Sequence, residues 1–179
     1  MRLSGGQVQR TAAARMVAHA AEMLVCDDLS SALDTSIQDA GLIIIATPMA
    51  GLRPTLRKLR ELGSRVPVIW VCKGLEADTM LLPHQVADEE MAPAVARGTL
   101  CGPSFAQEVA QGLPCAITLA SAQGDFARDM VTELNTPVLR LYASEDIVGV
   151  EIGAAVKNVI AIAAGVCDGL NLGFNARAA

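Results

Sequence analysis

An apolar run, a helix-forming segment and a second apolar run follow one another early in the chain, and this order constrains the fold more than any other feature. Leu42–Ala46 is short and rich in β-branched residues, as buried parallel strands are, and Val66–Cys72 reads as the next strand. Leu52–Leu62 between them consists of helix formers and ends before Gly63, a residue typical of helix C-termini. This spacing predicts a right-handed βαβ unit in a parallel sheet.

The alternation continues to residue 145 and predicts an α/β fold. Further strands are expected before Gly102 and over Ala116–Ala120 and Val138–Ala143. Helices are expected over Leu81–Glu90, from Ser104 as N-cap to Gly112, and over Phe126–Leu134. The acidic helix is expected on the surface with His84 exposed, and the basic face of the helix at 52–62 is expected to be solvated.

A long apolar helix is predicted over Gly149–Leu170. At 100° per residue, one face collects mostly small residues together with Lys157: Gly153, Ala154, Lys157, Ala161, Ala164 and Asp168. One interpretation is that a ligand or another backbone approaches this face, and that Lys157, with little water around it, exchanges protons near neutral pH. The alternative is a core helix whose Lys157 reaches solvent along its aliphatic stem.

Two segments follow predicted strands and can meet a ligand, because ligands in open α/β sheets lie beyond the carboxyl ends of the strands. Lys73 directly follows Val66–Cys72 and can reach a phosphate or a carbonyl; a solvated loop lysine is the alternative. Gly102, Pro103 and Ser104 link a strand to the N-terminus of a helix, a place that favours an anion.

Composition excludes several classes of function. The 179 residues carry a formal net charge of −5 and only 3% aromatic residues, which argues against nucleic-acid binding. Five scattered cysteines without a C-x-x-C pair indicate neither a zinc site nor a disulfide framework, and predict a reducing, cytoplasmic location. No signal peptide is recognised, and no membrane span is expected because Glu151, Lys157 and Asn158 interrupt the most apolar segment.

Residues 1–34 resemble the ATP-binding subunit of ABC transporters. Leu3–Gln7 matches the signature loop, Met23–Asp27 a Walker B strand and Ser31–Asp34 the D-loop, whereas Asp28 replaces the usual glutamate. A G-x-x-x-x-G-K-[ST] motif is absent from the chain, so no phosphate cradle is recognised. Leu24–Leu33 also fits the family described next, so either pattern accounts for it.

From about residue 35 to 179 the chain resembles NAD(P)-dependent glycerol-3-phosphate dehydrogenase. Three segments carry the resemblance: Trp70 with Val71–Glu76, the string Gly102–Pro114, and Gly149–Ala179 with its Lys157–Asn158 pair. The resemblance implies a partial Rossmann-like parallel sheet followed by the start of an α-helical domain. It divides the chain into the transporter-like segment 1–34, a partial NAD(P)-binding domain at 35–145 and the start of a helical substrate domain at 146–179.

The resemblance also implies the chemistry. Dihydroxyacetone phosphate would be reduced by NADH or NADPH to sn-glycerol 3-phosphate, or the reverse, in support of phospholipid synthesis. Lys157 would be the catalytic proton donor and acceptor and bind substrate, Lys73 would contact substrate and cofactor, Gly102 and Ser104 would line the substrate, and Ala106 would contact the cofactor. No metal is implied, and a homodimer is compatible with the family. The G-x-G-x-x-G fingerprint is absent from the sequence, and an ABC-type ATPase fragment or a non-catalytic fusion product is the alternative.

Overall fold

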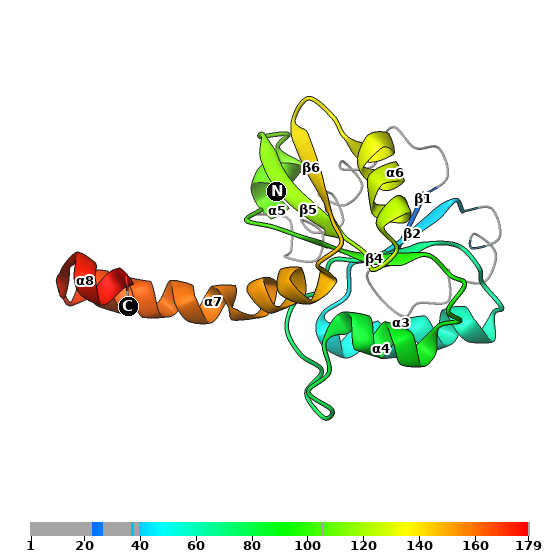
Figure 1. The fold of residues 1–179 in the computed structure, drawn as a ribbon, viewed down its shortest axis with the longest axis horizontal. Helices are drawn as coiled ribbons and strands as arrows, with labels where there is room; N and C mark the ends of the chain where they lie inside the picture. The colour runs from blue at the N-terminus through cyan, green and yellow to red at the C-terminus, as the bar shows by residue number, and fades with distance from the viewer. Residues whose placement is uncertain (1–22, 27–36, 38–39, 105, 179) are drawn as a thin grey trace, which may run out of the picture.

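The computed structural model describes residues 23–26, 37, 40–104 and 106–178. They form a six-stranded sheet in which each strand lies beside the one before it in the chain (Figure 1). The strands are β1 (Met23–Cys26), β2 (Leu42–Ile45), β3 (Val68–Trp70), β4 (Arg97–Cys101), β5 (Cys115–Ala120) and β6 (Leu139–Ser144). The predicted α/β class is confirmed, and the early strand of the transporter-like segment is β1, which pairs in parallel with β2.

Helices lie on both faces of the sheet. They are α3 (Met49–Glu61), α4 (Pro83–Glu90), α5 (Ala106–Ala110), α6 (Gly124–Leu134), α7 (Ile147–Gly169) and α8 (Gly173–Ala178). The side chains of Ile43 and Ile45 pack with those of α3 and α4, whereas Leu42 and Ile44 pack on the other face with those of α6. This alternation explains why β2 is apolar at every position, since both faces of a covered strand are buried.

One pairing departs from the predicted parallel sheet. β4 and β5 are antiparallel, with Cys101 opposite Thr118, while every other neighbouring pair is parallel. A parallel crossover needs a long connection, usually a helix that covers the sheet. The connection from β4 to β5 holds only the five-residue α5, which accounts for the change in direction.

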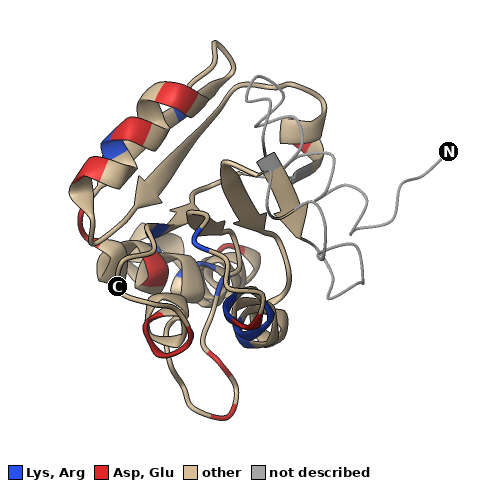
Figure 2. Cartoon of the chain, turned by 90° about the vertical axis from the view of Figure 1, so that its right-hand side faces the viewer, with Lys and Arg blue, Asp and Glu red and all other residues tan. Residues whose placement is uncertain are grey.

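The sequence suggested that the basic face of α3 is solvated, but three of its arginines form ion pairs. Arg53, Arg57 and Arg60 stand one turn apart and all reach Glu90, whose side chain is 5% exposed, with N–O distances of 3.0, 2.8 and 2.9 Å. The same Arg53 also contacts Glu89 at 2.7 Å. Charges of opposite sign from α3 and α4 therefore join the two helices, in the lower half of the molecule in Figure 2.

A third carboxylate, that of Glu76, binds Arg53. Nε and Nη2 of Arg53 donate to its two oxygens at 2.8 Å each, and these bonds lower the pKa of Glu76 to about 2. Because the folded pKa lies below the unfolded one, Glu76 stabilises the fold fully above about pH 4.5, and this contribution is lost as the pH falls toward about 2.

We therefore expect the urea midpoint of unfolding to fall through this acidic window. Glu76→Gln should lower the midpoint at neutral pH and make it fall less steeply in acid, because glutamine has no proton to gain. A wild-type midpoint that stays constant through the window would contradict this expectation.

The most prominent helix, α7, extends away from the sheet, with α8 against its far end (Figure 1). Only Ile147 and Glu151 of its residues are buried, so the alternative of a core helix is wrong. Within the described part of the chain it is the one helix long and apolar enough to cross a membrane by length and composition, with a hydropathy of 1.8 over its most apolar window. The expectation that nothing spans a membrane therefore stays a prediction.

Candidate functional site

A pocket of about 300 Å³ lies where the ends of β3 and β4 meet the first turns of α7. Three of the residues singled out in the sequence line it: Lys73, Gly102 and Lys157. They come from separate parts of the chain, and the fold brings them together. The full lining is Lys73, Cys101, Gly102, Pro103, Thr118, Gly149, Val150, Gly153, Ala154 and Lys157.

Lys73 is held at the pocket by the loop that follows β3. Gly74 has a φ of 101°, a conformation that glycine adopts without strain, so the chain turns directly after Lys73. Glu76, bound to Arg53 of α3, fixes the far side of this turn. The Lys73 ammonium donates to the carbonyl oxygen of Gly102 at 3.4 Å, which links the ends of β3 and β4.

Gly102 allows β4 and β5 to approach each other closely. A Cβ atom at this position would lie 3.0 Å from Cα of Ile117 and 3.1 Å from the carbonyl oxygen of Ala116. Such contacts are too short for a side chain without a shift of the backbone. The glycine thus keeps the end of β4 against β5 while its carbonyl oxygen meets Lys73.

The third wall of the pocket is a stripe of α7. Gly149, Gly153 and Lys157 recur at intervals of four residues and share one helix face, with Val150 and Ala154 beside them. The predicted small-residue face next to Lys157 is therefore confirmed for its first half as a wall of the pocket. Lys157 is half-buried and not shielded from water as expected, because most of α7 is exposed.

Two predicted residues are not in the pocket lining. Ser104 is half-buried just beyond Pro103, and α5 begins two residues later, at Ala106. The predicted N-cap role of Ser104 is not seen, since the residue directly before α5 lies outside the described part of the chain. Ala106 is the first residue of α5, and its side chain also lies outside the described part.

Two polar side chains of the pocket, Cys101 and Thr118, were not predicted from the sequence. Both lie in predicted strands, but their closeness depends on the antiparallel pairing of β4 with β5, for which the sequence held no signal. Thr118 places a hydroxyl group in the pocket. Burial raises the pKa of the Cys101 thiol, so it is a neutral group at physiological pH.

The chemistry of the pocket is cationic. Among the described residues, its lining contains two lysines, one hydroxyl, one neutral thiol and no carboxylate. Ammonium groups attract phosphate and carboxylate groups and stabilise negative charge that develops on an oxygen during a reaction. The pocket is therefore suited to a small anionic ligand with a polar, reactive oxygen.

His84 was expected to be exposed, but the structure places it in a buried contact. Its Nδ1 atom lies 2.6 Å from Oε2 of Glu151 in α7, and its side chain is only 17% exposed. The Trp70 indole donates to the other oxygen of Glu151 at 2.8 Å. Periodicity alone could not reveal this, since the partner lies in a distant helix.

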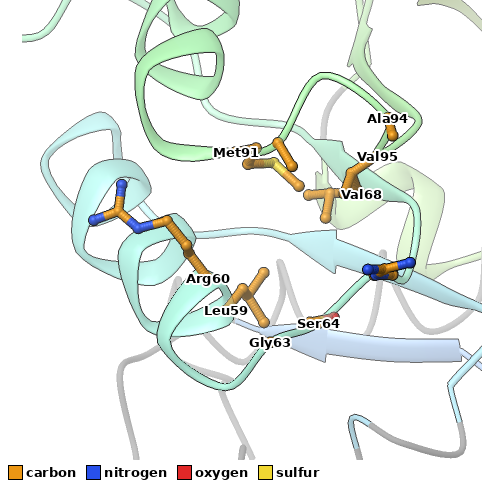
Figure 3. Close-up of a pocket in the computed structure, with 10 residues that line it drawn as sticks. Leu59, Arg60, Gly63, Ser64, Val68, Met91, Ala94 and Val95 are labelled. Carbon is orange, nitrogen blue, oxygen red and sulfur yellow. The ribbon is translucent and has the colours of Figure 1, made fainter.

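A larger pocket of about 380 Å³ lies near the opposite, amino ends of the strands (Figure 3). Val68 at the start of β3 and Leu59 of α3 form part of its apolar wall, and Arg60 on its rim pairs with Glu90. It contains no residue predicted for the site. Since ligands of open α/β sheets lie at the carboxyl ends, we assign the candidate site to the pocket between Lys73 and Lys157.

One buried hydroxyl group marks a position for a cofactor. Thr47 lies two residues beyond the end of β2 and is 5% exposed, and its Oγ1 atom has no hydrogen-bond partner among the described residues. Buried polar groups are normally satisfied, so an orphan at the carboxyl end of a strand indicates a ligand or water that completes it. Dinucleotides lie across such strand ends, so Thr47 and the neighbouring Lys73 fit one end of a dinucleotide.

The chain also matches two protein-family models. Residues 13–127 match the model described as NAD-dependent glycerol-3-phosphate dehydrogenase N-terminus, and residues 146–179 match the corresponding C-terminus model. The chain is 56% identical over 151 residues to glycerol-3-phosphate dehydrogenase [NAD(P)+] of Nitrosospira multiformis, and 53% identical over 151 residues to that of Dechloromonas aromatica. These alignments cover 84% of this chain but only 45% and 46% of the relatives.

Solved structures resemble the fold as well. The crystal structure of glycerol-3-phosphate dehydrogenase from Coxiella burnetii matches with a TM-score of 0.69 at 35% identity, over 82% of this chain and 45% of that one. The enzyme of Plasmodium falciparum has the same fold, with a TM-score of 0.77 at 21% identity over 98% of this chain and 60% of that one.

The N-terminal match extends into the transporter-like segment. It begins at residue 13, and the described residues of that segment form β1 of the sheet; the rest of 1–34 lies almost wholly outside the described residues. The ATPase alternative therefore has no support, and the division into 1–34, 35–145 and 146–179 stays a prediction. The chain belongs to the NAD-dependent glycerol-3-phosphate dehydrogenase family.

Proposed function

We propose that the pocket between Lys73 and Lys157 binds dihydroxyacetone phosphate and sn-glycerol 3-phosphate and interconverts them with NAD or NADP. The observation that carries the proposal is that both lysines line one pocket with Gly102, in a chain of this family. A phosphorylated three-carbon substrate is small and anionic, as the cationic lining requires. The chain spans about half the length of its relatives, so the dehydrogenase activity of this chain is a proposal.

Each lysine has a defined part in the reaction. Lys157 gives a proton to the carbonyl oxygen of the substrate during reduction and takes it back during oxidation, as general acid–base catalysis requires. The Lys73 ammonium holds and polarises the substrate, so that negative charge on the oxygen is stabilised as it develops. Gly102 and Ser104 would line the phosphorylated substrate.

The cofactor would lie beside these residues. Lys73, Ala106 and the orphan hydroxyl group of Thr47 are the residues proposed to hold it. NAD(P)H, when bound, supplies the hydride for the reduction. The fingerprint that binds a pyrophosphate is absent from the sequence, so the proposed contacts concern the nicotinamide end alone.

The location and partners follow from the same proposal. Cys72, Cys101, Cys115 and Cys167 are free thiols, which supports a reducing compartment and hence the cytoplasm. The small-molecule partners are dihydroxyacetone phosphate and sn-glycerol 3-phosphate, in support of phospholipid synthesis. A homodimer remains compatible with the family, and no nucleic acid is proposed.

Two measurements on the purified chain test this function. We expect NADH or NADPH to be oxidised only when dihydroxyacetone phosphate is present. We also expect sn-glycerol 3-phosphate to protect Lys73 and Lys157 from acylation by acetic anhydride, with each lysine quantified by mass spectrometry. The chain has three lysines, and Lys58 on α3 serves as the internal reference because it does not line the pocket. The proposed site would be refuted if the chain showed neither turnover nor protection of the two lysines.

A further inference from the structure

The most completely hydrogen-bonded buried carboxylate near the site belongs to Glu151, on a different face of α7 from Lys157. Glu151 is 2% exposed. Its Oε1 atom accepts from Trp70 Nε1 at 2.8 Å and from the backbone N–H of His84 at 3.1 Å. Its Oε2 atom lies 2.6 Å from Nδ1 of His84 and accepts from the same backbone N–H at 3.2 Å. These groups join α7 to β3 and α4.

The rest of α7 offers few other attachments to the sheet. Ile147, its only other buried residue, and the partly buried Val150 pack against the core. Apolar side chains occur on every side of the helix, among them Ile152, Val156, Val159 and Ile160, all exposed. Apolar contacts are not directional, so they would permit several rotations of such a helix about its axis. Hydrogen bonds are directional. Within the described residues, the buried hydrogen bonds that select one rotation of α7 about its axis are those of Glu151.

The rotation of α7 decides which residues face the pocket. With Glu151 directed at Trp70 and His84, the stripe of Gly149, Gly153 and Lys157 faces Lys73. Lys157 lies six positions after Glu151 in the chain, which places the two residues about 120° apart around the helix. A rotation away from this state would carry Lys157 out of the pocket while Lys73, in the loop after β3, stayed in place.

We infer that Glu151 is a positioning residue: its bonds to Trp70 and His84 set the rotation of α7 and thereby place Lys157 opposite Lys73. Glu151 does not line the pocket, so it acts through Lys157. The inference rests on the proposed function for its meaning in catalysis. The placement of Lys157 can nevertheless be measured without any turnover.

The test compares the acylation rates of Lys157 and Lys58 in the full chain without ligand. In Glu151→Ala we expect the ratio of Lys157 to Lys58 to rise about threefold to tenfold, the equilibrium equivalent of one lost hydrogen bond, because Lys157 leaves the pocket. In Glu151→Gln the amide oxygen still accepts from Trp70, so the ratio should return close to that of the wild type. Trp70 is the only tryptophan in the chain. Its fluorescence emission should change in Glu151→Ala and stay close to that of the wild type in Glu151→Gln.

A matched control separates positioning from general stability. Leu56→Ala removes a fully buried side chain of α3 and destabilises the fold without removing a hydrogen bond of Glu151. At a temperature where all variants are folded, the inference requires an unchanged ratio in Leu56→Ala. It is overturned if Leu56→Ala raises the ratio as much as Glu151→Ala does, or if Glu151→Ala leaves it unchanged.

Ligand protection distinguishes this inference from the proposed function. In the wild type, sn-glycerol 3-phosphate should protect both pocket lysines, and in Glu151→Ala only Lys73 should remain protected. If the wild type shows no protection, the proposed function fails while the ligand-free ratio still decides the role of Glu151. If protection of both lysines survives in Glu151→Ala, the positioning role fails and the proposed function stands.

Discussion

Replacing Lys157 with alanine is expected to lower the rate of NAD(P)H oxidation with dihydroxyacetone phosphate by about 10²- to 10⁴-fold, the usual contribution of a positioned acid or base. The described residues that line the pocket contain one other ammonium group, that of Lys73, and no carboxylate. No neighbouring side chain therefore offers an equivalent proton donor opposite Lys73. Initial rates with varied substrate give kcat and KM separately, and the loss should lie mainly in kcat.

Two further variants define what Lys157 contributes. Lys157→Arg keeps the positive charge but cannot release a proton at neutral pH, so its rate should stay close to that of Lys157→Ala. Lys58→Ala changes a lysine outside the pocket and should leave the rate unaltered. A fully active Lys157→Arg would show that the charge alone matters and that Lys157 is not the proton donor.

Replacing Glu90 with alanine is expected to have the largest effect on stability among the charged residues. Glu90 is buried at the junction of α3 and α4 and accepts from Arg53, Arg57 and Arg60. Bonds from Arg57 and Arg53 lower the pKa of Glu90, so it is ionised at neutral pH. Its removal leaves three cations together, and we expect a loss of about 2 kcal/mol in the free energy of unfolding, or ~4–8 °C in Tm.

Glu89 supplies the matched control. It is the neighbouring acid on α4, its side chain is 55% exposed, and it contacts Arg53 alone at 2.7 Å. Exposed pairs contribute little because water screens them, so Glu89→Ala should cost less than about 1 kcal/mol. Equal losses in the two variants, measured by urea unfolding, would mean that the three-arginine cluster does not depend on Glu90.

Much of the candidate site could be predicted because its signals are local. Lys73 follows an apolar strand and Gly102 ends another, so the rule that ligands lie at the carboxyl ends of strands indicated both positions, and the resemblance to a known family gave them a role. Lys157 was selected by helical periodicity and by the resemblance of its surroundings to a known family. The family matches confirm that resemblance, whereas the roles of these residues stay predictions.

Other features could not be predicted because they depend on partners far away in the chain. The antiparallel pairing that brings Thr118 to Cys101 follows from how a short connection packs. His84 and the arginines of α3 were expected to be solvated, since helix periodicity shows which residues share a face but not what lies opposite. Their partners, Glu151 and Glu90, come from other helices.

By itself the sequence determined the α/β class, the order of strands and helices and the identity of the two lysines, because apolar periodicity, chain breakers and short motifs are local properties. The tertiary structure alone decided that β5 reverses direction and that Glu151 fixes α7 against Trp70 and His84. Only that packing places Lys157 beside Lys73. The physical reason is that burial and directional hydrogen bonds between distant segments exist only once the chain is folded.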